Sequence, residues 1–117
     1  MAAVNGAFYV KPDTGCEEST QVVELNDPEF RYTQRLVVHE RKLVEFAVVL
    51  DRFQGGRWVE VYSIDTQHGV LHQHISGHQR KDDRRDIQPL YTQVDVQESL
   101  DDPADRMVLE KYRRMRN

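Results

Sequence analysis

The sequence predicts an α+β fold, in which an antiparallel β-meander of four or five strands carries a C-terminal helix packed on one face. Residues 31–76 are rich in valine, phenylalanine and other residues that are typical of strands. Gly55-Gly56 and His68-Gly69 interrupt this segment, and both pairs are typical of tight turns between antiparallel strands. Apolar residues then recur at helical spacing over residues 103–116.

The individual elements follow from the local sequence in chain order. Asn26-Asp27-Pro28 predicts a turn after a short first strand, and the polar residues 77–89 predict a loop after the last strand. Residues 95–100 predict a helical turn, and Asp102-Pro103 predicts an N-cap and first helical position for a helix that runs through Arg116. The predicted strands cover residues 21–25, 34–40, 43–53, 57–65 and 70–76.

Length and charge indicate one folded domain preceded by an acidic arm. The chain has 117 residues, which is about the size of an average domain. We expect residues 1–30 to be a partly ordered N-terminal arm and residues 31–117 to form a single α+β domain. Within residues 1–29 Lys11 is the only base, and the acids are Asp13, Glu17, Glu18, Glu24, Asp27 and Glu29.

The end of the predicted C-terminal helix is basic, although the net charge of the chain is −4. Two interpretations stay open. Cations in a last turn complement the negative end of the helix dipole, and a cluster of cations can also bind a polyanion. The bases of this segment are Arg106, Lys111, Arg113, Arg114 and Arg116, with Glu110 as its only acid.

Composition excludes several classes of protein. Hydrophobic residues make up 38% and charged residues 31% of the chain, as in soluble globular proteins. Because no apolar run approaches the ~20 residues that span a bilayer, we expect no membrane association, and we expect no secretory signal. The single cysteine, Cys16, cannot form an internal disulfide or a cysteine-only zinc site. We therefore expect the protein in the cytoplasm.

Strand alternation predicts which side chains share a face of the meander. A two-residue glycine turn places Val48 opposite Ser63, and the following turn places Asp65 opposite His72. One face then combines a hydrophobic centre with a polar end around Asp65, His72 and His74. We expect the helix to cover the hydrophobic centre and the polar end to form a pocket at its rim.

Four of the five histidines lie within residues 65–78, namely His68, His72, His74 and His78. General acid–base catalysis is the first interpretation of this cluster. Histidine changes charge near neutral pH, so His72 and His74 could exchange protons while Asp65 orients one ring. One imidazole would deprotonate a ribose 2′-hydroxyl, the other would protonate the leaving oxygen, and an arginine would stabilise the phosphate. The supporting residues would be Arg35, His39 and His68.

A metal site and a purely structural cluster are the alternatives. His-x-His on a strand presents two imidazoles to zinc or another transition metal. Histidines also occur at strand ends and turns, where they form hydrogen bonds with backbone groups and perform no chemistry. The ligands of a zinc ion would be Asp65, His68, His72 and His74.

A longer pattern extends over the same residues. It reads Asp-x-x-His-Gly-x-x-His-x-His after the meander and ends with a Tyr-Arg pair in the helix, at Asp65, His68, Gly69, His72, His74, Tyr112 and Arg113. Over roughly residues 34–116 the chain resembles small bacterial proteins with this pattern and is similar to the TumE-like toxins of toxin–antitoxin pairs. The resemblance implies a toxin-like nuclease and an antitoxin-like protein partner.

These observations predict a small toxin-like endoribonuclease that cleaves RNA without a cofactor. Asp65, His72 and His74 would be its catalytic residues. RNA and an antitoxin-like protein are the expected partners, and the apolar stripe of the C-terminal helix would serve as core or as a homodimer seam. The alternative is a non-enzymatic binding or assembly module, whose histidines are structural or hold zinc.

Overall fold

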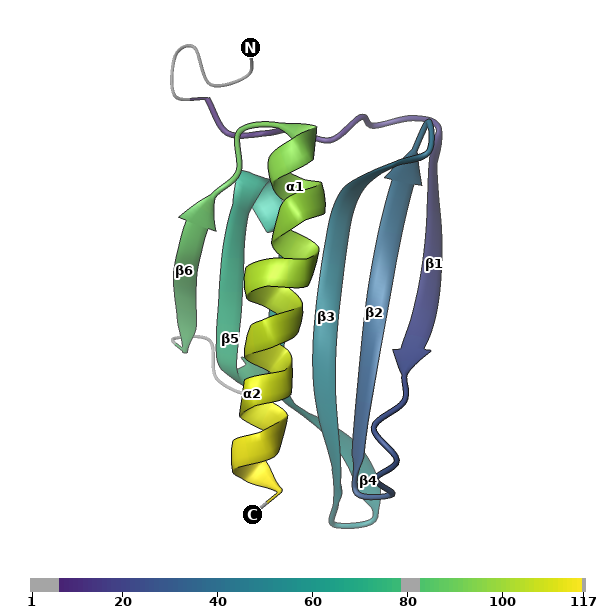
Figure 1. Cartoon of the computed structure of the whole chain (residues 1–117), viewed down its shortest axis with the longest axis vertical. Coiled ribbons are helices and arrows are strands. Elements are labelled where there is room, and N and C mark those ends of the chain that lie inside the picture. Colours follow the sequence, from purple (N-terminus) through teal and green to yellow (C-terminus); the bar gives the residue numbers. More distant parts are fainter. Residues whose placement is uncertain (1–6, 79–82, 117) are drawn as a thin grey trace.

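The computed structural model describes residues 7–78 and 83–116 and shows an antiparallel sheet with a helical segment on one face (Figure 1). The α+β class is confirmed. The predicted number of four or five strands is wrong, because the sheet has six strands in the order β1-β2-β3-β4-β5-β6. The strands are β1 (Cys16–Val23), β2 (Phe30–His39), β3 (Lys42–Gln54), β4 (Arg57–Asp65), β5 (Val70–His78) and β6 (Arg84–Pro89).

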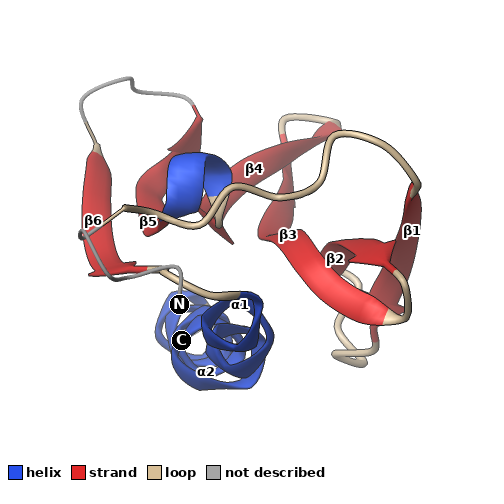
Figure 2. Cartoon of the chain, turned by 90° about the horizontal axis from the view of Figure 1, so that it is seen from above, coloured by secondary structure: helices blue, strands red, loops and turns tan. Residues whose placement is uncertain are grey.

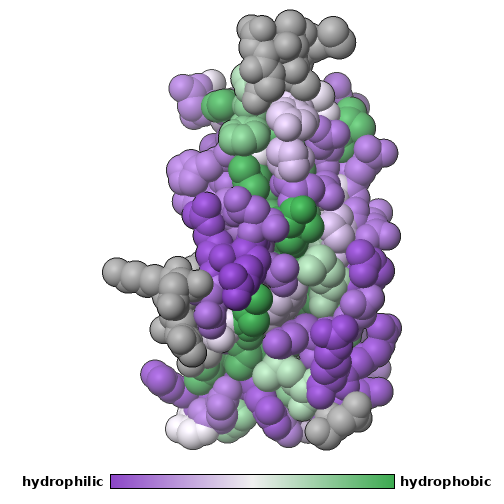
Figure 3. All heavy atoms as spheres, turned by 90° about the vertical axis from the view of Figure 1, so that its left-hand side faces the viewer, coloured by the Kyte–Doolittle hydropathy of each residue, from purple (hydrophilic) through white to green (hydrophobic). Residues whose placement is uncertain are grey.

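Both edge strands lie where the sequence has few apolar residues. Strand β6 falls inside the segment predicted as a polar loop, and His72 of β5 lies opposite Asp86 of β6. Strand β1 lies within the segment predicted as an N-terminal arm, and its Cys16 lies opposite His39. The side of the molecule that carries β6 is largely hydrophilic, with a narrow band of hydrophobic side chains (Figure 3). Charged side chains are typical of edge strands, which explains why no apolar alternation marks β6.

The helical segment consists of α1 (Gln93–Ser99), the irregular turn η2 (Leu100–Asp105) and α2 (Arg106–Met115). A capping box starts α1: the Thr92 hydroxyl accepts the N–H of Asp95 at 3.1 Å, and the Asp95 carboxylate accepts the N–H of Thr92 at 3.2 Å. The predicted helix start at Asp102-Pro103 is wrong. Asp102 has extended backbone angles, φ −150° and ψ 119°, inside η2, and regular helix resumes at Arg106.

One core joins the helical segment to the sheet, which curves around it (Figure 2). Phe46, Leu50 and Ile64 of the sheet are fully buried together with Val108 of α2. A polar contact crosses the same interface, since the hydroxyl of the fully buried Tyr32 donates a 2.7 Å hydrogen bond to Asp105. Burial of these apolar side chains holds the helical segment on this face of the sheet.

A β-bulge overturns the predicted assignment of side chains to the two faces. The register of β3 and β4 shifts between Leu50 and Asp51, so Val48 lies opposite Ile64 and not opposite Ser63. Because neighbouring residues of a strand point to opposite faces, Ile64 faces the helix with Val48, whereas Ser63 and Asp65 lie on the helix-free face. The predicted pairing of Asp65 with His72 is confirmed.

A short segment of the chain before β1, residues 8–11, crosses the end of the sheet where β4 meets β5 (Figure 2). We call it the strap. The N–H of Tyr9 donates to the carbonyl of Leu90 at 2.7 Å, and the N–H of Leu90 donates to the carbonyl of Gly69 at 2.8 Å. Gly69 has φ +73°, and a Cβ atom there would lie 2.6 Å from the carbonyl oxygen of Tyr9. Only glycine allows the strap to lie this close.

Candidate functional site

The predicted histidine cluster lies on the helix-free face of strands β4 and β5. Asp65 is opposite His72, and Ser63 is opposite His74. The short turn η1 (Gln67–Gly69) connects the two strands and carries His68, whose φ of +60° is the left-handed conformation. We expected the helix to cover the face that carries Asp65 and His72. The structure places these residues on the opposite face.

The side chain of His72 is buried and forms hydrogen bonds that connect three elements. Its side chain is only 2% exposed. Nε2 lies 2.9 Å from the carbonyl oxygen of Gln67 in η1, and Nδ1 lies 2.9 Å from Oδ1 of Asp86 in β6. A carbonyl oxygen only accepts, so Nε2 carries a hydrogen. The carboxylate of Asp86 is the hydrogen-bond partner of the other ring nitrogen, Nδ1. His72 therefore joins β5, η1 and β6, and both of its nitrogens are engaged.

Asp65 and His74 form the second pair of the cluster. The Nε2–H of His74 donates to Oδ2 of Asp65 at 3.0 Å, and the N–H of Gln67 donates to Oδ1 of Asp65 at 3.1 Å. The Asp65 and His74 side chains are 15% and 13% exposed. The carboxylate thus fixes both the start of η1 and the imidazole ring. A carboxylate–imidazole pair of this kind can orient a ring for proton transfer or stabilise a turn.

A hollow of about 300 Å³ adjoins Asp65 on the helix-free face. Ala47 lies opposite both Arg35 and Asp65 in the sheet, and its small side chain leaves room between the two charged residues. Arg35 already forms ion pairs with Glu18 at 3.0 Å and with Glu45 at 3.1 Å. Two carboxylates therefore offset the charge of this arginine. The hollow is lined by Arg35, Glu45, Phe46, Ala47, Asp65 and Gln67.

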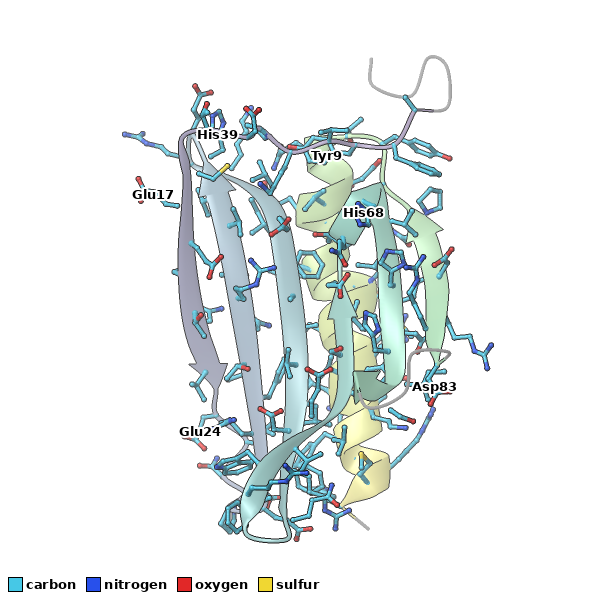
Figure 4. All side chains as sticks on the ribbon, turned by 180° about the vertical axis from the view of Figure 1, so that it is seen from behind. Tyr9, Glu17, Glu24, His39, His68 and Asp83 are labelled. Atoms are coloured by element: carbon cyan, nitrogen blue, oxygen red, sulfur yellow. The ribbon has the colours of Figure 1, made fainter. Side chains whose placement is uncertain are left out.

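A second hollow of about 450 Å³ lies beneath the strap and shares Glu45 and Gln67 with the first. Its lining includes His68 and Tyr9 (Figure 4). Burial raises the pKa of Tyr9, and the neighbouring Cys16 raises it further. The Tyr9 hydroxyl is thus protonated at neutral pH and is available as a hydrogen-bond donor. The two hollows adjoin through Glu45 and Gln67, and we call them together the depression.

The structure brings some of the predicted site residues together and separates others. Asp65, His68 and Arg35 line the depression, His74 contacts Asp65, and His72 is buried beside them. His39 lies at the end of β2, and strand β3 separates it from β4 (Figure 4). The predicted supporting role of His39 therefore has no geometric basis. The side chain of His78 lies outside the described part of the chain.

The predicted zinc ligands do not converge in the described part of the chain. Within residues 7–78 and 83–116, no three His, Cys, Asp or Glu side chains converge as metal ligands would. The two nitrogens of His72 face the Gln67 carbonyl and Asp86, which leaves neither nitrogen directed at a shared position with His68. The geometry of the described residues thus does not assemble the predicted ligand set.

Sequence reasoning missed two residues that complete the cluster. Asp86 binds His72 from a strand predicted as loop, and Glu45 lines both hollows and pairs with Arg35. Asp86 belongs to a run of charged residues with no distinguishing pattern. Glu45 alternates with hydrophobic residues along β3, which places it on the helix-free face, and the correct register would have placed Asp65 on that face with it.

Within the described ranges, no helix combines the length and the apolar character needed to span a bilayer.

Comparisons with known proteins add one finding. Searches of curated proteins and of solved structures gave no match. A family profile described as "Domain of unknown function (DUF7718)" matches residues 16–116, a span that contains all six strands and the helical segment. The chain therefore belongs to the DUF7718 family.

Proposed function

We propose that this chain is a non-enzymatic binding module, in which the Asp65, His72 and His74 cluster is structural and supports the depression beside Asp65. The burial of His72 carries this proposal. A histidine with 2% exposure and a hydrogen bond at each nitrogen cannot take a proton from a substrate without losing one of its structural partners. The cluster instead fixes η1 and β6 around the depression.

The charges of the hollow beside Asp65 favour a basic ligand. Glu45 and Asp65 are partly buried, with side chains 24% and 15% exposed, and Glu18 adds a third carboxylate through Arg35. One arginine is thus outnumbered by carboxylates whose oxygens retain further accepting capacity. A phosphate would meet net repulsion here, whereas a guanidinium or ammonium group would be attracted. We propose that the hollow receives an arginine or lysine side chain of a protein partner.

Titration with N-acetyl-arginine amide, followed by amide chemical shifts, tests this binding. We expect the signals of Ala47, Asp65 and Gln67 to shift, because these residues line the hollow. Ala47→Leu should abolish the shifts by filling the hollow, and N-acetyl-glutamate amide should cause none. Shifts that persist in Ala47→Leu, or equal shifts with the glutamate compound, would contradict the proposed ligand.

A toxin-like endoribonuclease is the second candidate. The observation in its favour is the Asp65–His74 pair at the edge of a hollow that also contains Arg35, since an oriented imidazole beside an arginine is an arrangement that serves phosphodiester cleavage. Two features count against it. His72 has both nitrogens engaged, and the charge of Arg35 is offset by Glu18 and Glu45.

A further inference from the structure

The basic end of the helical segment borders a groove that the proposed function does not use. The groove has a volume of about 380 Å³ and lies between α2 and strands β4 and β5, on the helix-covered side of the sheet. In Figure 1, α2 runs beside β5 at this position. Three of the five bases of the C-terminal segment line it, namely Arg106, Lys111 and Arg114.

Among the described residues, two of these three cations have no carboxylate partner. Arg106 forms ion pairs with Asp102 at 2.9 Å and with Glu110 at 3.1 Å, so its charge is compensated. Across the described ranges, 7–78 and 83–116, no carboxylate lies within ion-pair distance of Lys111 or Arg114. Glu110 also lines the groove and pairs with Arg106, so the described lining carries three cations and one carboxylate in a chain whose net charge is −4.

The floor of the groove is a buried tyrosine flanked by apolar side chains. Tyr62 is 4% exposed, and its hydroxyl donates a 2.9 Å hydrogen bond to Oε1 of Gln73. The Nζ atom of Lys111 lies 5.7 Å from the centre of the Tyr62 ring. Burial, together with the nearby carboxylate of Glu110, raises the pKa of Tyr62 to about 12 against an opposing, lowering effect of Arg114. The charge of Arg114 thus acts on the floor of the groove.

We propose that this groove binds the phosphate monoester group of an organic phosphate. A phosphate monoester carries a charge of about −1.5 to −2 at neutral pH, which matches the two uncompensated cations. Lys111 offers a compact ammonium group, and Arg114 offers a planar fork suited to phosphate oxygens. Ile75 and Met107 line the same groove and provide an apolar surface for the organic part of the ligand. This site is separate from the hollow proposed to bind a basic side chain.

The helix dipole alone does not account for this arrangement. Cations near the C-terminal end of a helix stabilise it wherever they point. Arg113 and Arg114 are both in the last turn of α2, yet only Arg114 lines the groove. Substitutions of these two neighbours can therefore be compared directly. Both residues are near the negative end of the helix dipole, but of the two only Arg114 lines the groove.

Isothermal titration with adenosine 5′-monophosphate, adenosine and inorganic phosphate tests the proposal. We expect the wild-type chain to bind the monophosphate and inorganic phosphate but not adenosine. Arg114→Ala and Lys111→Ala should each weaken binding of the monophosphate about tenfold, the effect of losing one charge-assisted contact, and Arg113→Ala should leave it unchanged. Equal weakening by Arg113→Ala and Arg114→Ala, or equal binding of adenosine and its monophosphate, would overturn the proposal.

Competition with short RNA identifies the source of the phosphate. If a 5′-phosphorylated oligonucleotide displaces adenosine 5′-monophosphate and its 5′-hydroxyl counterpart does not, the phosphate belongs to an RNA end. If neither displaces it, the ligand is a small organic phosphate. Displacement by both oligonucleotides to the same extent would mean that the groove binds the phosphodiester backbone, which contradicts recognition of a phosphate monoester.

Discussion

Replacing Phe46 with alanine is expected to lower the free energy of unfolding by about 3–5 kcal/mol. Phe46 is fully buried at the centre of β3, where the sheet meets the helical segment. Its loss removes a large apolar surface and leaves a cavity that the surrounding strands can fill only in part. Urea denaturation followed by far-ultraviolet circular dichroism measures the change.

Phe53→Ala is the matched control for this substitution. Phe53 is on the same strand but is 46% exposed, and its main aromatic contact is an edge-on arrangement with Trp58 at 5.4 Å. We expect the free energy of unfolding to fall by about 1 kcal/mol, which is the typical contribution of one aromatic pair. If both variants lost the same stability, the assignment of the core to the helix-covered face would be wrong.

Replacing His72 with alanine is expected to lower the free energy of unfolding by about 2–3 kcal/mol. The substitution leaves a cavity where the 2% exposed imidazole was, and it removes the hydrogen bond from Nε2 to the carbonyl of Gln67, which keeps the N–H of Val70 as a donor. Asp86 contributes less to the loss, because its side chain is 64% exposed and regains water. The same denaturation experiment measures the effect.

His68→Asn provides the control for His72→Ala. His68 lies four residues away and is exposed, and asparagine readily adopts the left-handed conformation that His68 has at φ +60°. Its substitution should change stability by no more than about 0.5 kcal/mol. A His72→Ala variant as stable as His68→Asn would show that the cluster does not hold η1 and β6 in place.

The hairpins of the sheet could be predicted from the sequence because each depends on short-range signals. Gly55-Gly56 marks the β3–β4 turn, and the next turn fixes Asp65 opposite His72. The faces of the sheet could not be predicted in the same way. One extra residue at the bulge beside Leu50 reverses which side chains of β4 share a face with those of β3. No residue type in β3 or β4 indicates that a bulge is present.

The histidine cluster could be located from the sequence, but its burial could not. The spacing of His72 and His74 places both rings on one face, and the structure agrees. The hydrogen-bond partners of His72 come from other elements, namely the backbone carbonyl of Gln67 and the carboxylate of Asp86. Strand β6 supplies Asp86, and its charged sequence has no apolar period to reveal a strand. Long-range contacts of this kind leave no local pattern.

The most direct test of a structural role for the cluster is an assay of RNA cleavage combined with thermal unfolding. Wild type, His74→Ala and the control His39→Ala would be incubated with single-stranded RNA in the presence of a chelator, and the melting temperature of each preparation would be recorded. We expect no cleavage by any of the three. Cleavage by wild type and by His39→Ala, lost in His74→Ala at an unchanged melting temperature, would show that the cluster is an active site and would rule out a purely structural role.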